Sequence, residues 1–220
     1  MTDKVKKEIE KLIKKLNLNC SIEQFKDKVG WYYISWDQFL SEDFIREFQD
    51  KVDWYWTSYN QTLSEEFIRE FKDKVDWYAI SYRQKLSEKI IREFKDKVSW
   101  SHISYAQILS ENFIKEFKDK VNWGDISYHQ KLSEDFIREF KNKVDWMNIS
   151  IFQQLSENFI REFEGKINWF LISASQTLSE DFIKEFEEKL DLDYLLKKHK
   201  ISQDFYNFLI KVNRFQLMDI

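Results

Sequence analysis

Tryptophan recurs at a constant interval of 23 residues, at Trp31, Trp54, Trp77, Trp100, Trp123, Trp146 and Trp169. A fixed period of this size is the signature of a repeat array, in which each unit buries its apolar face against its neighbours. Seven units span residues 31–191 and leave 30 residues before them and 29 after them. We therefore expect one continuous domain with an N-terminal cap at 1–30, seven repeats at 31–191, and a degenerate C-terminal capping repeat and tail at 192–220.

The composition narrows the fold class. The chain has no proline and three glycines, which excludes collagen, flexible linkers and loop-rich β-architectures. Aromatic residues make up 18% of it, enough apolar mass for a substantial core although 34% of the residues are charged. These features favour an all-α chain.

Charge and cysteine content bear on partners and location. The net charge is −4 and the two signs are interspersed, so nucleic acid is an unlikely partner. A lone cysteine, Cys20, cannot form an internal disulfide, which favours a reducing compartment. No stretch approaches the roughly 18 apolar residues of a transmembrane helix. We expect a cytoplasmic protein that is neither secreted nor bound to a membrane.

With each tryptophan as position 1, the repeat reads W-x-x-I-S-x-x-Q-x-L-S-E-x-F-I-x-E-F-x-x-K-V followed by Asp, Asn or Ser at position 23. Positions 5, 8, 10, 11, 12, 15, 17, 18 and 21 are identical in all seven copies. Position 4 departs from isoleucine at Thr57, and position 14 departs from phenylalanine at Ile90.

Two helix starts are visible in each repeat. The serine of position 11 is a good N-cap, and positions 10, 14, 15, 18 and 22 then form one apolar stripe opposite charged residues. We expect those charges to serve only solubility and helix support. The residue at position 23 caps the next first helix; the rival start is a capping box between Ser35 and Gln38. We prefer the longer first helix.

Each repeat is therefore predicted to hold two helices of roughly nine and eleven residues, too short to be stable alone. Stacking them gives an α-solenoid of short helical hairpins, with the tryptophan of position 1 buried between layers. In the C-terminal cap, Asp191 and Ser202 are the expected helix caps, and Leu192, Leu195 and Phe205 the expected core residues.

The string LSEDFIREFKDKVDWYYIS, assembled from parts of residues 31–35, 40–49, 63–80 and 132–150, resembles short tandem repeats in proteins of large and giant DNA viruses, including the marseillevirus and mimivirus groups. The resemblance covers residues 31–191. It implies a viral protein in the host-cell cytoplasm or in the virion, and it brings no reaction and no functional residues.

Catalytic motifs are missing: the sequence has no glycine-rich phosphate loop, no HExxH, no CxxC pair and no G-x-S-x-G. His102, Asp125 and His129 could hold zinc, but scattered surface residues explain them as well. We expect no enzyme activity, no cofactor and no metal. The glutamine of position 8 faces inward in every copy, and its amide is expected to bond along the stack to other amides or to helix ends.

Positions 2, 3, 6, 7 and 9 vary between copies and lie mainly on the outer face of the first helices. Large aromatic residues on such a face are typical interface anchors. Binding and lateral packing both explain the tyrosines, whereas binding is favoured for Trp36 and Trp56. The predicted partner-binding residues are Tyr33, Trp36, Trp56, Tyr59, Tyr82, Arg83, Tyr105 and Tyr128.

The function predicted from the sequence is a non-enzymatic scaffold that binds another protein, or its own copies, through the variable face of the first helices. One alternative is single-stranded nucleic-acid binding by stacked aromatics, for which only Arg83, Lys85 and Lys131 supply positive charge. Another is a structural component packaged in a viral particle.

Overall fold

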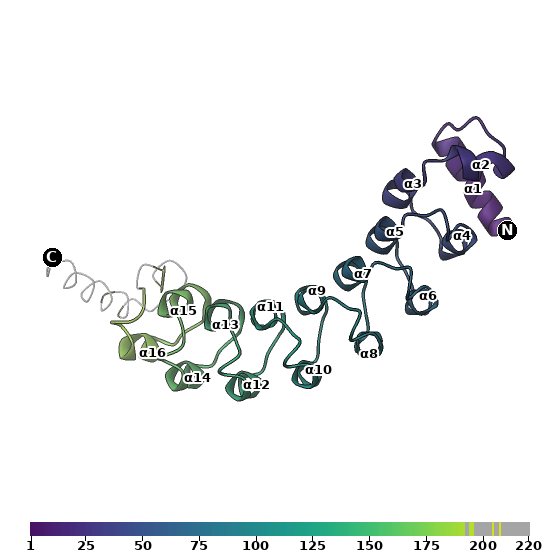
Figure 1. Ribbon diagram of the computed structural model, residues 1–220. Helices are drawn as coiled ribbons and strands as arrows, with labels where there is room; N and C mark the ends of the chain where they lie inside the picture. Colours follow the sequence, from purple (N-terminus) through teal and green to yellow (C-terminus); the bar gives the residue numbers. More distant parts are fainter. Residues whose placement is uncertain (192–193, 196–203, 205–206, 208–220) are drawn as a thin grey trace. The chain divides into compact units, whose positions relative to one another are not determined.

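The computed structural model describes residues 1–191, 194, 195, 204 and 207, and within them the regular secondary structure is entirely helical (Figure 1). Two helices, α1 (Asp3–Lys15) and α2 (Ile22–Lys28), precede the repeats. Each repeat then contributes a first and a second helix, in the order α3 (Trp31–Asp37), α4 (Glu42–Glu47), α5 (Trp54–Asn60), α6 (Glu65–Glu70), α7 (Trp77–Arg83), α8 (Glu88–Glu93), α9 (Trp100–Ala106), α10 (Glu111–Glu116), α11 (Trp123–His129), α12 (Glu134–Glu139), α13 (Trp146–Phe152), α14 (Glu157–Glu162), α15 (Trp169–Ser175) and α16 (Glu180–Glu185).

The chain divides into two compact units, the first ending at Gln107 and the second beginning at Ile108. In the first unit the first helices α3, α5, α7 and α9 pack in one row, and the second helices form another row beside it (Figure 1). In the second unit α11, α13 and α15 pack in the same way. Helix pairs thus recur every 23 residues and stack on their neighbours, which confirms the predicted α-solenoid.

Both helices of a repeat are shorter than predicted, seven and six residues instead of about nine and eleven. The first helix ends at the glutamine of position 8, whose backbone is extended, as at Gln84 with φ −85° and ψ 146°. The second ends at the phenylalanine of position 18. At Phe71, φ is −108° and ψ is 26°, and the Phe71 carbonyl accepts a hydrogen bond from the Lys74 N–H at 2.8 Å, which forms a turn. Apolar periodicity continues past both ends because turn residues also face the core.

The predicted serine cap of the second helix is confirmed: the Ser64 hydroxyl, for example, accepts the Phe67 N–H at 3.1 Å. The first helix is capped from position 23, where Asp53 accepts the Trp56 N–H at 3.0 Å. The rival start at Ser35 is wrong, because Ser35 lies inside α3.

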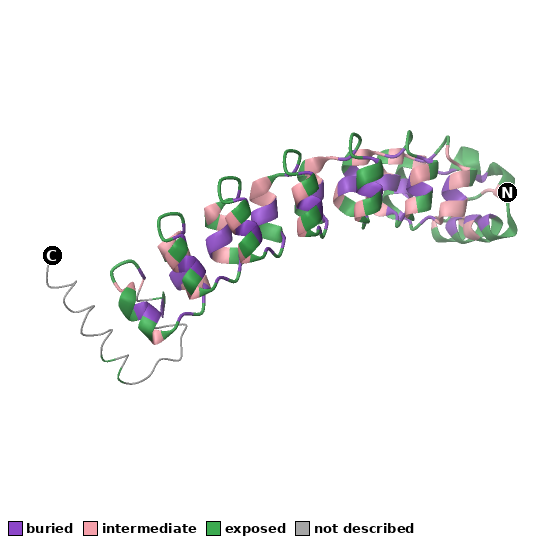
Figure 2. Ribbon diagram, turned by 90° about the horizontal axis from the view of Figure 1, so that it is seen from below, coloured by how far each residue is buried: buried purple, intermediate pink, exposed green. Residues whose placement is uncertain are grey.

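Buried residues lie on both the first and the second helix of each repeat and recur from repeat to repeat (Figure 2). Among the apolar positions, 4, 14 and 15 are the most deeply buried, as at Phe67 and Ile68. The tryptophan of position 1 was expected to be buried too, and this is wrong, since all seven are half-buried. The ring of Trp54 lies on Phe71 of its own repeat, 5.1 Å between centroids, while its indole N–H reaches the Gln49 carbonyl of the preceding repeat at 2.9 Å. Because the indole contacts both the Phe71 ring and the Gln49 carbonyl, it lies at the edge of the layer and is only half-buried.

At the N-terminus, α1 buries Val5, Ile9 and Leu12 and packs against α2 and α4. At the other end Asp191 accepts the Tyr194 N–H at 3.2 Å and Leu195 is buried, both as expected. The roles predicted for Leu192, Ser202 and Phe205 fall outside the described residues. Among the described helices, none is both long and apolar enough to cross a membrane.

Thr57 is a weak point of the core. It is fully buried at position 4, and its hydroxyl has no hydrogen-bond partner among the described residues. An unpaired buried polar group costs about 1–3 kcal/mol, and isoleucine fits this place in every other repeat. Thr57→Ile is therefore expected to raise the free energy of unfolding by about 1–2 kcal/mol in urea melts. Ile80→Thr is the control and should lower it; an unchanged Thr57→Ile melt would contradict the account.

Candidate functional site

The glutamine of position 8 joins each repeat to the one before it. The Gln84 amide nitrogen donates to the backbone carbonyls of Ser58 and Gln61 at 2.9 and 2.7 Å, and its oxygen accepts the Leu63 N–H at 3.1 Å. The three backbone groups lie at or just beyond the end of the preceding first helix, where no intrahelical partner exists. The predicted amide ladder is therefore present, but its bonds go to backbone groups and not from amide to amide.

The serine of position 5 makes a second link between repeats. The Ser58 hydroxyl donates to the Trp54 carbonyl one turn earlier at 2.7 Å and accepts the Asp76 N–H at 2.9 Å. Asp76 is the N-cap of the next first helix, α7. One hydroxyl thus ties the middle of one first helix to the start of the following one.

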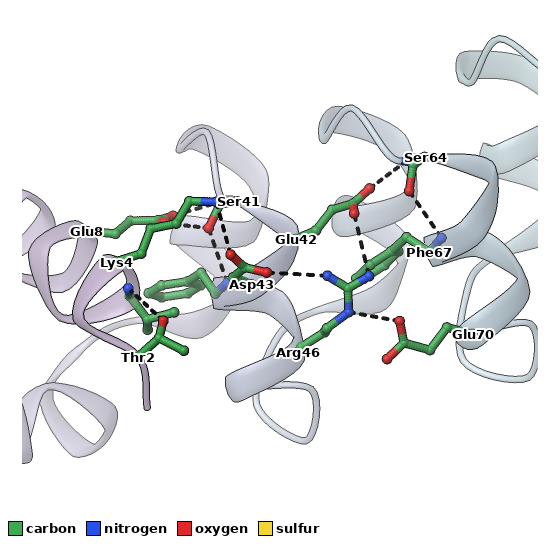
Figure 3. Close-up of polar contacts among 12 residues, drawn as sticks. Thr2, Lys4, Glu8, Ser41, Glu42, Asp43, Arg46, Ser64, Phe67 and Glu70 are labelled. Atoms are coloured by element: carbon green, nitrogen blue, oxygen red, sulfur yellow. Dashed lines mark hydrogen bonds and ion pairs between the residues drawn. The ribbon is translucent and has the colours of Figure 1, made fainter.

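The glutamate of position 12 links the second helices (Figure 3). Glu42 accepts the Ser64 N–H of the next repeat at 2.6 Å and pairs with Arg46 of its own helix. The cap helix α1 supplies the same chemistry for the first repeat, since Glu8 accepts the Ser41 N–H at 2.9 Å. The cap therefore imitates a preceding repeat.

Ion pairs continue along the second helices. Arg46 at position 16 contacts Glu70 at position 17 of the next repeat, with Nε and Oε2 2.8 Å apart, and its guanidinium lies over the Phe67 ring at 5.0 Å. The lysine of position 21 behaves alike: Lys74 pairs with Asp50 of the preceding repeat and lies over Trp54. The expectation that these charges serve only solubility and helix support is thus wrong, because they also contact neighbouring repeats.

The contacts of this network lower the pKa of the carboxylates Asp73 and Glu65. A hydrogen bond from Lys97 and its positive charge lower the pKa of Asp73. Burial acts to raise the pKa of Glu65, but the hydrogen bonds from Ser87 and the charge of Arg69 outweigh it, so the pKa is lowered. The network therefore favours ionised carboxylates at neutral pH.

These contacts explain the repeat's constant polar positions. The variable face of the first helices is not explained by them, and it is the candidate site. In the unit that ends at Gln107 we define the aromatic stripe as the rings at positions 2, 3 and 6 of α3, α5, α7 and α9. Its members are Tyr32, Tyr33, Trp36, Tyr55, Trp56, Tyr59, Tyr78, Tyr82, His102 and Tyr105.

Ring contacts make the aromatic stripe continuous across the four helices. Trp36 meets Trp56 at 6.3 Å between centroids, Tyr59 meets Tyr82 at 6.3 Å, and Tyr82 meets Tyr105 at 6.1 Å. The rings pack laterally and yet stay open to solvent: Trp36 is 47% exposed, whereas Trp56 is half-buried among its neighbours. Lateral packing, one of the two alternatives considered for the tyrosines, is therefore present at Tyr59, Tyr82 and Tyr105, and binding stays a prediction.

Two charged groups lie on this face. The Arg83 guanidinium sits over the Tyr59 ring at 4.8 Å. At the other end, the Tyr33 hydroxyl donates a hydrogen bond to Asp37, which raises the pKa of that phenol. Of the predicted residues, Tyr128 lies in the second unit, where it contacts Phe152 at 3.9 Å.

The sequence-based selection passed over position 2, which holds the most exposed rings of the stripe, Tyr32 at 61% and Tyr78 at 56%. Positions 2 and 6 are four residues apart and share a helix face, so the signal was available in the sequence. Position 3 does not face solvent in every repeat, since Ala79 is fully buried.

The structure gives no support to the zinc reading. Among the described residues there is no group of three or more histidine, cysteine, aspartate or glutamate side chains able to hold a metal ion. The ring of His102 instead lies 2.8 Å from the Ser99 hydroxyl through Nδ1 and contacts Tyr78.

Comparison with protein-family models, curated proteins and solved structures finds no match to this chain. The candidate site therefore rests on the geometry of the aromatic stripe.

Gln84→Ala tests the amide ladder. The change leaves the Leu63 N–H and two carbonyls of the preceding repeat without their partner, and should cost more than side-chain size suggests, about 2–4 kcal/mol in urea unfolding. Gln38→Ala is the matched control, because Gln38 is equally buried but bonds the side chain of Asp37. Equal losses in the two variants would refute the inter-repeat role.

Proposed function

We propose that the protein is a non-enzymatic scaffold that binds a protein partner through the aromatic stripe. The observation that carries this is the contrast between the two helix rows. Constant exposed residues of the second helices are engaged in contacts between repeats, as Glu70 is with Arg46 of the preceding repeat. The stripe instead varies from copy to copy and leaves large rings in water.

Exposed rings of this kind favour a partner. Contiguous apolar surface is uncommon on a protein that works alone, and tryptophan and tyrosine dominate the energetics of protein interfaces. The stripe also needs little ordering to bind, because its rings already pack on one another, as Trp56 does on Tyr55 at 5.0 Å. The partner is another protein or a second copy of the chain.

Single-stranded nucleic acid fits this face less well. Bases stack on aromatic rings, but such sites also carry cations that follow the phosphates. On the four first helices that hold the stripe, Arg83 is the one lysine or arginine, and the whole chain has a net charge of −4.

Site-specific photocrosslinking tests the proposal. A benzophenone amino acid replaces Tyr78 on the stripe or, as a control, the exposed Glu66 on a second helix. Irradiation in an extract of cells that express the protein should yield one discrete protein adduct from position 78 and none from position 66.

The affinity of the captured partner then decides which surface binds it. Trp36→Ala should weaken binding by about 2 kcal/mol, roughly 30-fold in Kd, with no loss of helix content. Phe39→Ala is the matched control: Phe39 is 90% exposed, but it lies in the connection after α3 and not on the stripe. If no adduct forms at position 78, or both truncations weaken binding equally, the proposal fails.

A further inference from the structure

The aromatic stripe is nearly free of charge. Among the sixteen residues at positions 2, 3, 6 and 7 of α3, α5, α7 and α9, the charged ones are Asp37 and Arg83, both exposed. The others are mainly tyrosine and tryptophan, with a few small or amide residues. A ligand for this face is therefore largely uncharged along its length, with opposite charges toward its two ends.

The face also offers hydrogen-bond donors. The indole N–H groups of the position-1 tryptophans bond to carbonyls, whereas those of Trp36 and Trp56 have no acceptor within the described part of the chain. The indole nitrogen of Trp56 is not buried, and Trp36 is 47% exposed. A polyproline II segment has the matching acceptors, since its backbone carbonyls make no internal hydrogen bonds.

The spacing of the layers matches the same conformation. Packed helices lie about 8–10 Å apart, and a polyproline II helix has three residues per turn at about 3.1 Å each, or about 9.3 Å per turn. A segment that runs across the first helices would therefore present the same side of its helix to each repeat. The rings of Trp36 and Trp56 contact each other edge to face, with 61° between their planes and 6.3 Å between their centroids, so they form one continuous aromatic surface on which proline rings can pack.

The positions of Asp37 and Arg83 set the length of the segment that this face would bind. Asp37 lies on α3 and Arg83 on α7, two layers away, which corresponds to about 16–20 Å and about five to six polyproline II residues. Asp37 already accepts the Gln38 amide and the Tyr33 hydroxyl, and a carboxylate has room for a further donor. Arg83 is held over Tyr59 with its guanidinium toward the face.

We propose that the aromatic stripe binds a proline-rich segment of another protein in the polyproline II conformation, with a basic residue at the Asp37 end and an acidic residue about six residues away at the Arg83 end. This inference rests on the proposed function and specifies the partner. Since the chain contains no proline, the segment cannot come from a second copy.

The test uses the full chain and a fluorescein-labelled synthetic peptide of one arginine, five prolines and one glutamate, which places the two charges six residues apart. Fluorescence anisotropy should show saturable binding to the wild type. A peptide with the same charged ends but glycine and serine in place of the prolines should bind at least tenfold more weakly, and Trp36→Ala should lose at least tenfold. Phe39→Ala should bind like the wild type.

Charge reversal tests the orientation. Arg83→Glu makes both ends of the face acidic, so it should prefer a peptide with arginine at both ends by at least fivefold over the mixed peptide. Lys85→Glu, which changes an exposed lysine just beyond α7, should keep the wild-type preference.

The outcomes separate the possibilities. Equal binding of the glycine–serine peptide would show attraction by charge alone, and tight binding of an oligothymidylate in place of the peptides would show a nucleic-acid surface; either overturns the inference. If no peptide binds while position 78 still captures a protein adduct, the proline-rich partner is wrong and the proposed function stands. If no peptide binds and position 78 captures no protein adduct, both the proline-rich partner and the proposed function are wrong.

Discussion

The hydrogen bonds that each repeat makes to the end of the preceding first helix are the interaction on which the rest of the structure depends. A helix of seven residues leaves more backbone groups unpaired than paired, so it cannot be stable by itself. Gln84 supplies three of the missing partners for α5 and its connection, and Ser58 of that helix positions the N-cap of α7. Glycine and proline are not needed at these ends, because side chains from the next repeat take over the capping.

The same dependence explains which residues are constant. Glu42, Glu70 and Lys74 are exposed or half-buried, yet each contacts a neighbouring repeat, so a change at one of these positions disturbs two repeats. The outer face of the first helices makes fewer contacts of this kind with neighbouring repeats. It can therefore differ from one repeat to the next, as from Trp36 to Tyr59 and Tyr82, without loss of the stack.

Much of the fold could be predicted from the sequence, because the 23-residue period, the apolar stripe and the caps at Ser64 and Asp53 are local patterns. The helix lengths could not, since Gln84 and Phe71 look like ordinary helical residues until their partners in other elements are known. The half-exposed tryptophans were missed for the same reason: the Gln49 carbonyl that holds Trp54 belongs to another repeat. The candidate site residues followed from the variability and aromatic character of the first helices, and this choice passed over Tyr32 and Tyr78.

The most direct measurement of the central claim is the removal of one whole repeat. Deletion of residues 77–99 should leave a folded, cooperative protein with unchanged helix content per residue by circular dichroism, because Gln107 then meets Ser58 and Gln61 as Gln84 does now. Deletion of residues 77–98, one residue short of the period, should unfold or strongly destabilise the chain, since the contacts across the junction lose register. If both deletions fold equally well, or if the 23-residue deletion unfolds, the contacts between repeats are not what holds this protein together.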